Sequence, residues 1–390
     1  MTETTAAIAV TDGHPHFSAE EMQRRHEVLL DAAGEAGVSR VLSVGSNRNG
    51  TAVQWLTGWP VTRDGFVLTE AGRPDTLLVG FYNHVPQARE LARDAEVGYV
   101  GPVPVETVLA TLAKRGPQRK PLGLVGPVSA HLHRSLTGAG IEVVDLNPAY
   151  TRLRQIKSAE EVAWLRRGAE LSDAGIAALT ASLRSGLTEH ELCDLVERAY
   201  VPRGGTTHIH YFGVTPMAAP ARANPAQYPS ARPVEPGDAV VLELSAAFGG
   251  YAGQVLRSFS VEADPTPLYQ ELHDVAERAF DAIAAVLQDG TTAAEIQDAA
   301  SLIEDAGFTT LDDLVHGFGG GYLPPVLGSR SRHLDPRPAP PIRTGMTVVV
   351  QPNVVTTDGR AGVQFGELLH VTEQGAERLH AAPRGMVRVG

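Results

Sequence analysis

The fold is decided by the stretch Val240-Val-Leu-Glu-Leu-Ser-Ala-Ala-Phe-Gly-Gly-Tyr-Ala-Gly-Gln-Val-Leu-Arg-Ser-Phe259. Apolar runs on both sides of the Gly-Gly pair predict a β-hairpin. Glu243 lies inside an otherwise apolar strand, where a carboxylate is costly unless it is paired, metal-bound or protonated. Gln254 and Arg257 on the returning strand are the polar residues available to meet it. A purely structural Glu–Arg pair is the alternative explanation.

The sequence around this hairpin alternates helical and extended segments. Three capping boxes, in which a hydroxyl and a glutamate satisfy each other's backbone amides, predict helix starts at Ser158, Thr188 and Thr292. A further amphipathic helix is expected over 268–287. Strands are expected over 206–214, 239–244, 251–261, 347–355 and 362–371. This half therefore reads as α+β, with one curved antiparallel sheet covered by helices.

The first half of the chain shows a different pattern of predicted elements. Short apolar runs at 39–44, 65–68, 76–79, 123–125 and 141–144 alternate with helical stretches such as 102–114, which is typical of an α/β domain. Residues 1–20 show no hydrophobic periodicity, so we predict that they form a flexible tail. A helix is predicted to follow from Glu21 to about Gly34. We therefore expect an N-terminal domain over 21–150 and a C-terminal domain over 151–390.

Composition limits the classes of function. The chain has 390 residues, of which 43% are hydrophobic, and its 33 Lys and Arg against 45 Asp and Glu give a net charge of −12. Such an acidic protein is a poor partner for nucleic acid or anionic lipid. Its one cysteine, Cys193, excludes a disulfide framework. With no signal sequence and no apolar membrane span, the protein is expected to be cytoplasmic.

Six stretches carry a likeness to a known family. They are Ser43-Val-Gly-Ser-Asn-Arg-Asn-Gly50, Arg154-Gln-Ile-Lys-Ser-Ala-Glu-Glu-Val-Ala-Trp-Leu-Arg166, the extended hairpin from Glu235, His316-Gly-Phe-Gly319, Thr344-Gly-Met-Thr-Val-Val-Val-Gln-Pro352 and Gly362-Val-Gln-Phe-Gly-Glu-Leu-Leu-His-Val371. In this order they resemble the "pita-bread" peptidases, which include aminopeptidase P, prolidase and creatinase. The resemblance implies an α/β N-terminal domain plus an α+β pita-bread C-terminal catalytic domain, and a homodimer.

This sequence differs from the family pattern at the positions of the metal ligands. The resemblance implies two divalent cations held by two Asp, one His and two Glu. The corresponding residues here are Glu243, Gln254, His316, Gln351 and Gly366, with Glu367 adjacent. Hard divalent cations prefer carboxylates, and neutral carboxamides do not offset their charge. We therefore expect no metal and no other cofactor, as in the metal-independent relatives creatinase and ectoine hydrolase.

Further candidates line the expected pocket. Strand alternation places His208 and His210 on one face, where one of them would transfer protons or both would form inert pocket wall. Two histidines without a third ligand argue against zinc. Arg222 and Arg257 are cations suited to a substrate carboxylate. Gln254, Gln351, Tyr251 and Glu367 complete the predicted substrate-binding set.

The sequence thus predicts a metal-independent hydrolase of an amide-type C–N bond in a small polar metabolite, such as a deacylase or amidase of a natural-product pathway. Glu243 would act as nucleophile or general base, with His316 and one of His208 and His210 as proton-transfer partners. The amides of Gln254 and Gln351 would orient the carbonyl or the attacking water. Two alternatives are an inactive pseudo-peptidase that serves as a binding module and an Xaa-Pro metallopeptidase.

Overall fold

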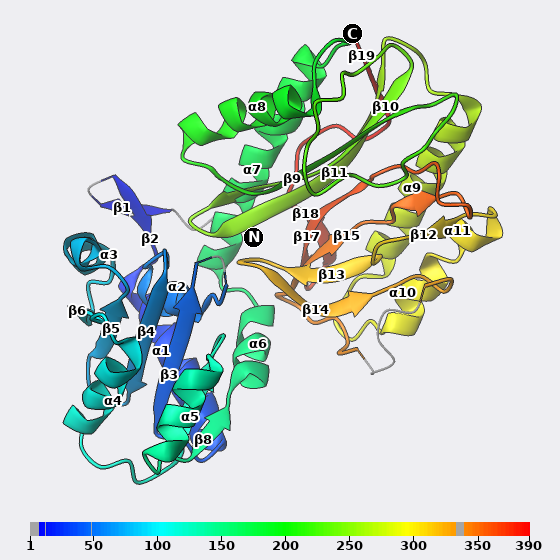
Figure 1. The fold of residues 1–390 in the computed structure, drawn as a ribbon. Coiled ribbons are helices and arrows are strands. Elements are labelled where there is room, and N and C mark those ends of the chain that lie inside the picture. The colour runs from blue at the N-terminus through cyan, green and yellow to red at the C-terminus, as the bar shows by residue number, and fades with distance from the viewer. Residues whose placement is uncertain (1–7, 12, 48, 333–338) are drawn as a thin grey trace. The chain divides into compact units, whose positions relative to one another are not determined.

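The computed structural model describes residues 8–11, 13–47, 49–332 and 339–390. The chain divides into two compact units between Arg154 and Gln155. Among the described residues, no helix is long and apolar enough to cross a membrane. Each unit is described by itself below, with the elements labelled as in Figure 1.

The N-terminal unit is an α/β sheet with helices, as predicted. Its strand order is β6-β5-β4-β3-β7-β8, in which β3 pairs antiparallel with β4 and parallel with β7. The strands are β3 (Arg40–Ser46), β4 (Asp64–Glu70), β5 (Asp75–Val79), β6 (Ala95–Tyr99), β7 (Leu122–Val125) and β8 (Val143–Asp145). The helices are α1 (Ala19–Glu35), α2 (Ala52–Thr57), α3 (Val85–Leu91), α4 (Pro104–Lys114), α5 (Ala130–Gly138) and α6 (Asn147–Gln155), with a 3₁₀ turn η1 (Tyr82–His84).

The flexible tail predicted over 1–20 lies partly outside the described residues, and its described part contains two short strands that were not predicted. Strands β1 (Ala9–Thr11) and β2 (His14–His16) pair as a small antiparallel hairpin. Helix α1 then begins at Ala19, capped by the Ser18 hydroxyl, which accepts a hydrogen bond from the Glu21 amide. The hairpin was missed because its strands are only three residues long and lack apolar alternation.

The C-terminal unit holds a large curved sheet with strand order β14-β13-β15-β17-β11-β10-β9. Its strands are β9 (Thr206–Pro216), β10 (Asp238–Phe248), β11 (Tyr251–Val261), β13 (Val315–Phe318), β14 (Tyr322–Leu327), β15 (Thr347–Val350) and β17 (Gly366–Thr372). Strands β18 (Gly375–Arg378) and β19 (Val387–Val389) attach to β17 and β11, and β12 (Thr309–Thr310) pairs with β16 (Val354–Val355). The strand predicted over 347–355 is therefore divided in two.

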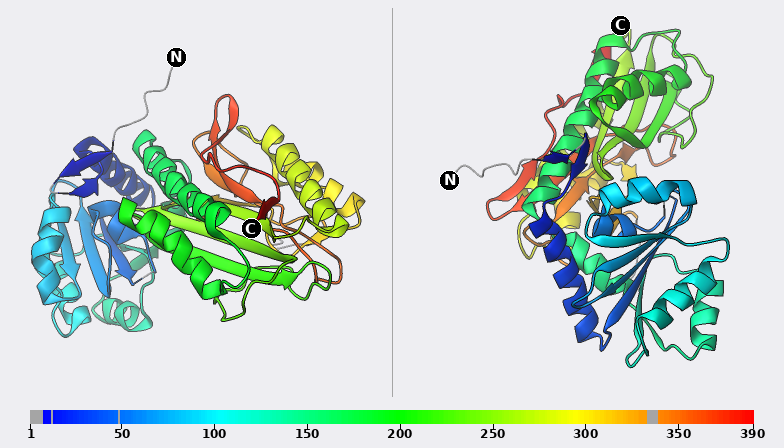
Figure 2. Two further views of the ribbon diagram at one scale, coloured as in Figure 1. Left: turned by 90° about the horizontal axis from the view of Figure 1, so that it is seen from above. Right: turned by 90° about the vertical axis from the view of Figure 1, so that its left-hand side faces the viewer.

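Helices cover one face of this sheet. They are α7 (Ala159–Ser182), α8 (Glu189–Tyr200), α9 (Pro267–Val286), α10 (Ala293–Ala299) and α11 (Leu302–Asp305), with a 3₁₀ turn η2 (Val201–Arg203) after α8. The three predicted capping boxes all form, at the starts of α7, α8 and α10. Figure 2 shows α7 lying along β10 and β11. We call the covered side the helix face and the opposite side the site face.

Candidate functional site

Strand register assigns the residues of the central hairpin to a face. Glu243 on β10 lies opposite Leu256 on β11, and Leu256 lies opposite Gly366 on β17. Directly opposed residues of antiparallel strands point to the same side of a sheet. Gln254, two residues before Leu256, points to that side as well. Glu243, Gln254 and Gly366 therefore share the site face.

The neighbouring strands add two more residues to this face. His316 on β13 lies opposite Val349 on β15, which in turn lies opposite Leu368 on β17. Leu368 is two residues beyond Gly366, so all three of these positions share the site face. Gln351 follows Val349 by two residues, just past the end of β15. The predicted residues Glu243, Gln254, His316 and Gln351 are thus brought together.

A chain of hydrogen bonds connects these side chains. The Gln254 Nε2 donates to Glu243 Oε1 at 2.6 Å and to Gln351 Oε1 at 3.1 Å. Gln351 is also hydrogen-bonded to the imidazole of His316, whose Nδ1 lies 3.1 Å from the Gly317 carbonyl oxygen. Burial lowers the pKa of His316 and so favours its neutral form. The site is therefore a connected polar layer in an apolar sheet.

The environment of the site alters the charge state of Glu243. Burial raises the pKa of Glu243 from 4.5 to about 8, and the charges of Asp312 and Asp313 push it the same way. The hydrogen bond from Gln254 acts in the opposite direction and is outweighed. A carboxyl with this pKa exchanges its proton close to neutral pH, so it is suited to both accepting and donating one.

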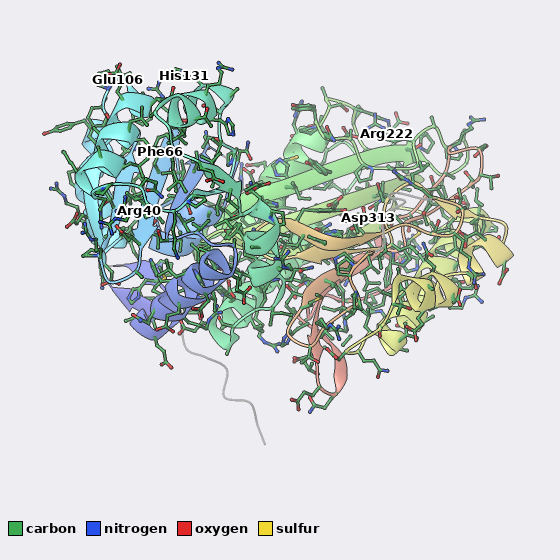
Figure 3. The ribbon with its side chains drawn as sticks, turned by 90° about the horizontal axis from the view of Figure 1, so that it is seen from below. Arg40, Phe66, Glu106, His131, Arg222 and Asp313 are labelled. Atoms are coloured by element: carbon green, nitrogen blue, oxygen red, sulfur yellow. The ribbon has the colours of Figure 1, made fainter. Side chains whose placement is uncertain are left out.

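Three further residues lie at this site and were not predicted from the sequence. Asp312 and Asp313 come just before β13, and Asp313 is marked in Figure 3. Tyr322 on β14 stacks on the His316 ring, with 4.1 Å between ring centroids and 18° between planes, and its hydroxyl hydrogen-bonds Asp313. Two adjacent acids immediately before the strand that carries His316 were the available signal.

Sheet curvature brings the two ends of the sheet together on the site face. The rings of His208 on β9 and Phe318 on β13 have centroids 6.0 Å apart. In the strand order, β15, β17, β11 and β10 lie between these two strands. A flat sheet would hold them far beyond contact, because neighbouring strands are about 4.8 Å apart. The curvature thus encloses the polar layer.

The prediction that His208 and His210 share a face is wrong. A β-bulge interrupts the pairing of β9 with β10 between Ser245 and Ala246, and His208 is the extra residue. His210 lies opposite Leu244, so it points to the helix face, where its Nδ1 is 3.3 Å from Glu197. A bulge shifts the alternation by one residue and re-aims the side chains beyond it. Only His208 of this pair contacts a residue of the site face.

Arg257 and Glu367 lie on the helix face. Arg257 is three positions after Gln254 on β11 and Glu367 is one position after Gly366 on β17, and an odd separation along a strand places a side chain on the opposite face. The Arg257 Nη2 donates to Glu367 Oε2 at 2.7 Å, and both side chains are 1% exposed. Arg378 also donates to Glu367. The placement does not support their predicted role in substrate binding; it matches the alternative of a structural Glu–Arg pair, with Glu367 in place of Glu243.

Tyr251 and Arg222 are likewise engaged elsewhere. Tyr251 points to the helix face, and its hydroxyl donates to Glu161 Oε1 of α7 at 2.7 Å. Arg222, marked in Figure 3, lies 3.7 Å from the buried carboxylate of Glu189 at the start of α8. These partners of Tyr251 and Arg222 lie outside the site-face cluster of Glu243, Gln254, His316 and Gln351.

The donor set does not fit the two cations that the resemblance implies. Of the five ligand positions, only Glu243 and His316 carry side chains that commonly bind such metals. The carboxamides of Gln254 and Gln351 are hydrogen-bonded to each other. Gly366 offers no donor, and a Cβ there would lie 2.8 Å from the Gln351 Cα and collide with the Val350 carbonyl oxygen. Within the described ranges, no group of three or more His, Cys, Asp or Glu is arranged to hold a metal.

Comparison with known proteins places this site in a family. An uncharacterized peptidase of Staphylococcus saprophyticus is 24% identical over 243 residues, covering 60% of this chain and 65% of the relative. An Xaa-Pro dipeptidase of Lactobacillus delbrueckii subsp. lactis is 28% identical over 178 residues, covering 45% and 48%. The chain thus spans less than two thirds of the length of these curated relatives.

The same fold occurs in solved structures. The Xaa-Pro dipeptidase from Bacillus anthracis superposes with a TM-score of 0.79 at 21% identity, covering 94% of this chain and 100% of that one. At this identity, the likeness shows the fold alone. The sequence profile of metallopeptidase family M24 matches residues 163–373, which include the whole polar layer. By this match over more than half of its length, the chain belongs to metallopeptidase family M24.

Proposed function

We propose that this protein hydrolyses an amide-type C–N bond in a small polar molecule, without a metal, and that Glu243 carries the proton transfers. The observation that supports this most is the state of Glu243, an enclosed carboxyl whose pKa is raised to about 8 and whose described hydrogen-bond donor is the neutral amide of Gln254. The relatives in the family are named as peptidases, and peptidases also cleave C–N bonds.

The chemistry needs only water and the substrate. Ionised Glu243 takes a proton from a water molecule as the water oxygen bonds to the amide carbon and the carbonyl electrons move to oxygen. The C–N bond then breaks, and the leaving nitrogen takes the proton from Glu243. The Gln254–Gln351 pair holds the carboxyl in place, while neutral His316, stacked under Tyr322, forms one wall. The nucleophile role that was also predicted for Glu243 uses the same ionised form.

The test is the Glu243→Gln variant, which keeps the shape of the side chain and removes the proton acceptor. Release of ammonia or amine from a panel of small amides would be measured for both proteins. Loss of a general base typically lowers turnover by about 10²–10⁴-fold. Glu271→Gln, an exposed change on α9, is the matched control and should leave turnover unchanged. Equal turnover of Glu243→Gln and the wild-type protein would overturn the proposal.

Two other functions remain as outcomes of that experiment. A binding module would show no turnover in either protein, since its polar layer would serve only to hold a ligand. An Xaa-Pro metallopeptidase would contain about two divalent ions per chain by elemental analysis, as the resemblance implies, and would lose activity with EDTA. The amide donors at Gln254 and Gln351 and the closed position at Gly366 argue against this second outcome.

The predicted homodimer and cytoplasmic location stay predictions. Closed two-fold association is the commonest form of soluble oligomer. Light scattering across a concentration series would check the dimer, and a constant monomer mass would contradict it.

A further inference from the structure

A tyrosine lies directly beside Glu243 on the site face and takes no part in the hydrogen bonds of the polar layer. Tyr211 on β9 pairs with Glu243 on β10 in the antiparallel register, so both side chains point to the site face. Directly opposed residues of such strands have Cβ atoms about 4.5–5.5 Å apart. The charge of Glu243 is one cause of the raised pKa of the Tyr211 phenol, so the two groups interact.

Exposure shows from which side a dissolved molecule reaches Glu243. Its neighbours on the site face, along β10 and across on β11, are fully buried; they are Val241, Ser245 and Leu256. The other members of the polar layer are buried as well; they are Gln254, His316 and Gln351. Glu243 and Tyr211 are both partly exposed. A small amide that approaches Glu243 past β9 therefore also reaches Tyr211.

The hydroxyl of Tyr211 is available as a hydrogen-bond donor. Within the described ranges, this hydroxyl makes no hydrogen bond. The Gln254 Nε2, in contrast, already uses both of its hydrogens inside the polar layer. The hydroxyl of Tyr322, the other tyrosine near Glu243, is engaged with Asp313. Tyr211 thus retains an O–H group that a substrate atom beside Glu243 can use.

Tyr211 keeps its proton at the pH at which Glu243 loses one. Burial raises the pKa of Tyr211 above its ordinary value of 10.0, and the charges of Glu243 and Tyr228 act in the same direction. The pKa of Glu243 is about 8. Between these two values, the opposed pair consists of an ionised proton acceptor and a neutral hydrogen-bond donor.

The proposed hydrolysis creates a negative charge that ionised Glu243 does not stabilise. When the water oxygen bonds to the amide carbon, the carbonyl electrons move to the carbonyl oxygen, which becomes an oxyanion. A carboxylate only accepts hydrogen bonds, so this oxygen needs a donor from another residue. A donor held in place before the reaction lowers the barrier, because it interacts more strongly with the oxyanion than with the neutral carbonyl.

We propose that the Tyr211 hydroxyl donates a hydrogen bond to the carbonyl oxygen of the substrate amide and stabilises the oxyanion that forms there. The phenol keeps its proton throughout the reaction. Glu243 still moves one proton from water to the leaving nitrogen, so atoms and charges balance as before. The inference rests on the proposed function for the reaction and adds a second catalytic residue to it.

The kinetic test is Tyr211→Phe, which removes the hydroxyl and keeps the ring. On an amide that the wild-type protein hydrolyses, kcat should fall by about 10²–10³-fold, and KM should change by less than about threefold. The rise of kcat/KM below pH 8 should remain, because it belongs to Glu243. Tyr82→Phe is the matched control. It removes a hydroxyl from a residue of the N-terminal unit that is 75% exposed, and it should keep the wild-type kcat.

A binding measurement tests the same contact without turnover. Methylphosphonamidate is a tetrahedral anion with the shape of the intermediate that water forms with acetamide. At about pH 7 Glu243 is mostly protonated, as it is in that intermediate. Calorimetry should show that Tyr211→Phe binds methylphosphonamidate about tenfold or more weakly than the wild type does, while its affinity for acetamide changes by less than about threefold.

The outcomes distinguish this inference from the proposed function. Wild-type kcat in Tyr211→Phe, or no difference between the two proteins in binding methylphosphonamidate, would overturn the inference and leave the role of Glu243 intact. A role in packing alone predicts that result, with a raised KM only in Tyr211→Leu. A wild-type protein that hydrolyses no amide refutes the hydrolase, and weaker binding of methylphosphonamidate to Tyr211→Phe would then still support the donor contact. Melting temperatures confirm that each variant is folded.

Discussion

Two glutamates on opposite faces of one sheet show how differently a carboxyl can be used. Glu367 on the helix face accepts hydrogen bonds from Arg257 and Arg378, and Glu243 on the site face accepts one from the neutral Gln254. Burial alone raises the pKa of Glu367, but the hydrogen bond from Arg378 and the charge of Arg257 hold it below its ordinary value. Burial raises the pKa of Glu243 to about 8 without any such compensation.

The difference indicates what each glutamate does. A carboxylate held by two guanidinium groups is fixed in its charged form and is a structural group. A carboxyl enclosed beside amides and other acids is poised between two protonation states, which is the condition for proton transfer. The Arg257 guanidinium also donates to the Gly366 carbonyl oxygen at 3.0 Å, so the structural pair supports the strand under the site.

The largest expected effect is on stability. If it were absent, the contrast between a structural Glu367 and a functional Glu243 would no longer hold. Glu367→Gln leaves the Arg257 charge buried without its counter-ion, so unfolding free energy should fall by about 3–5 kcal/mol. Chemical denaturation measures this. If that variant does not fold, Arg378→Gln removes a half-exposed donor and should cost a smaller amount, about 1–3 kcal/mol. Stability equal to wild type in both variants would contradict the structural role of Glu367.

The next effect is on the pH dependence of turnover. Ionised Glu243 is required as the base, so kcat/KM should rise about tenfold per pH unit below pH 8 and level off above it. The residual activity of Glu243→Gln should lack this rise. Rates from about pH 6 to 9 on a small amide that has no group titrating in this range would measure both. A profile that is flat through this range, or that falls as pH rises, would assign the proton transfer to another group.

A smaller effect is expected on stability at the same residue. Because the folded-state pKa of Glu243 is raised, the folded protein holds this proton between pH 4.5 and about 8 more tightly than the unfolded chain does. The stability contribution is therefore complete below pH 4.5 and is lost as pH rises through about 8. Glu243→Gln should match wild type at low pH and become the more stable protein as pH rises through about 8. Thermal unfolding across pH measures the difference.

Much of this site could be predicted from local sequence. The hairpin and the three capping boxes each depend on spacing within a short segment, whereas the cluster of Glu243, Gln254, His316 and Gln351 was predicted from the family resemblance. Strand period alone assigns Gln254 and Arg257 to opposite faces, since three positions separate them. The functional assignment of Arg257 and Glu367 to the pocket conflicted with that period, and the structure follows the period.

Other features depend on contacts between distant segments. The bulge that turns His210 away from the site arises from the pairing of β9 with β10, and nothing in Thr207-His-Ile-His210 marks it. Asp312 and Asp313 act on Glu243 only because the curved sheet brings β13 toward β10. Long-range placement of this kind is set by the whole sheet, so a motif of a few residues does not contain it.

The smallest predicted effect concerns Gly366, which directly precedes Glu367 and stands where the family resemblance implies a metal ligand. Any Cβ there would collide with the Val350 carbonyl oxygen, so Gly366→Ala forces β17 away from β15 and should cost about 1–2 kcal/mol. Gly34→Ala is the control, because that helical glycine has nothing within 4 Å of an added Cβ, and it should gain about 0.5–1 kcal/mol. Both substitutions add the same methyl group. Opposite changes in unfolding free energy would therefore show that the loss in Gly366→Ala comes from the contact between β17 and β15. Gly366→Ala as stable as wild type would contradict this prediction, because β15 and β17 would then have room for a side chain at this position.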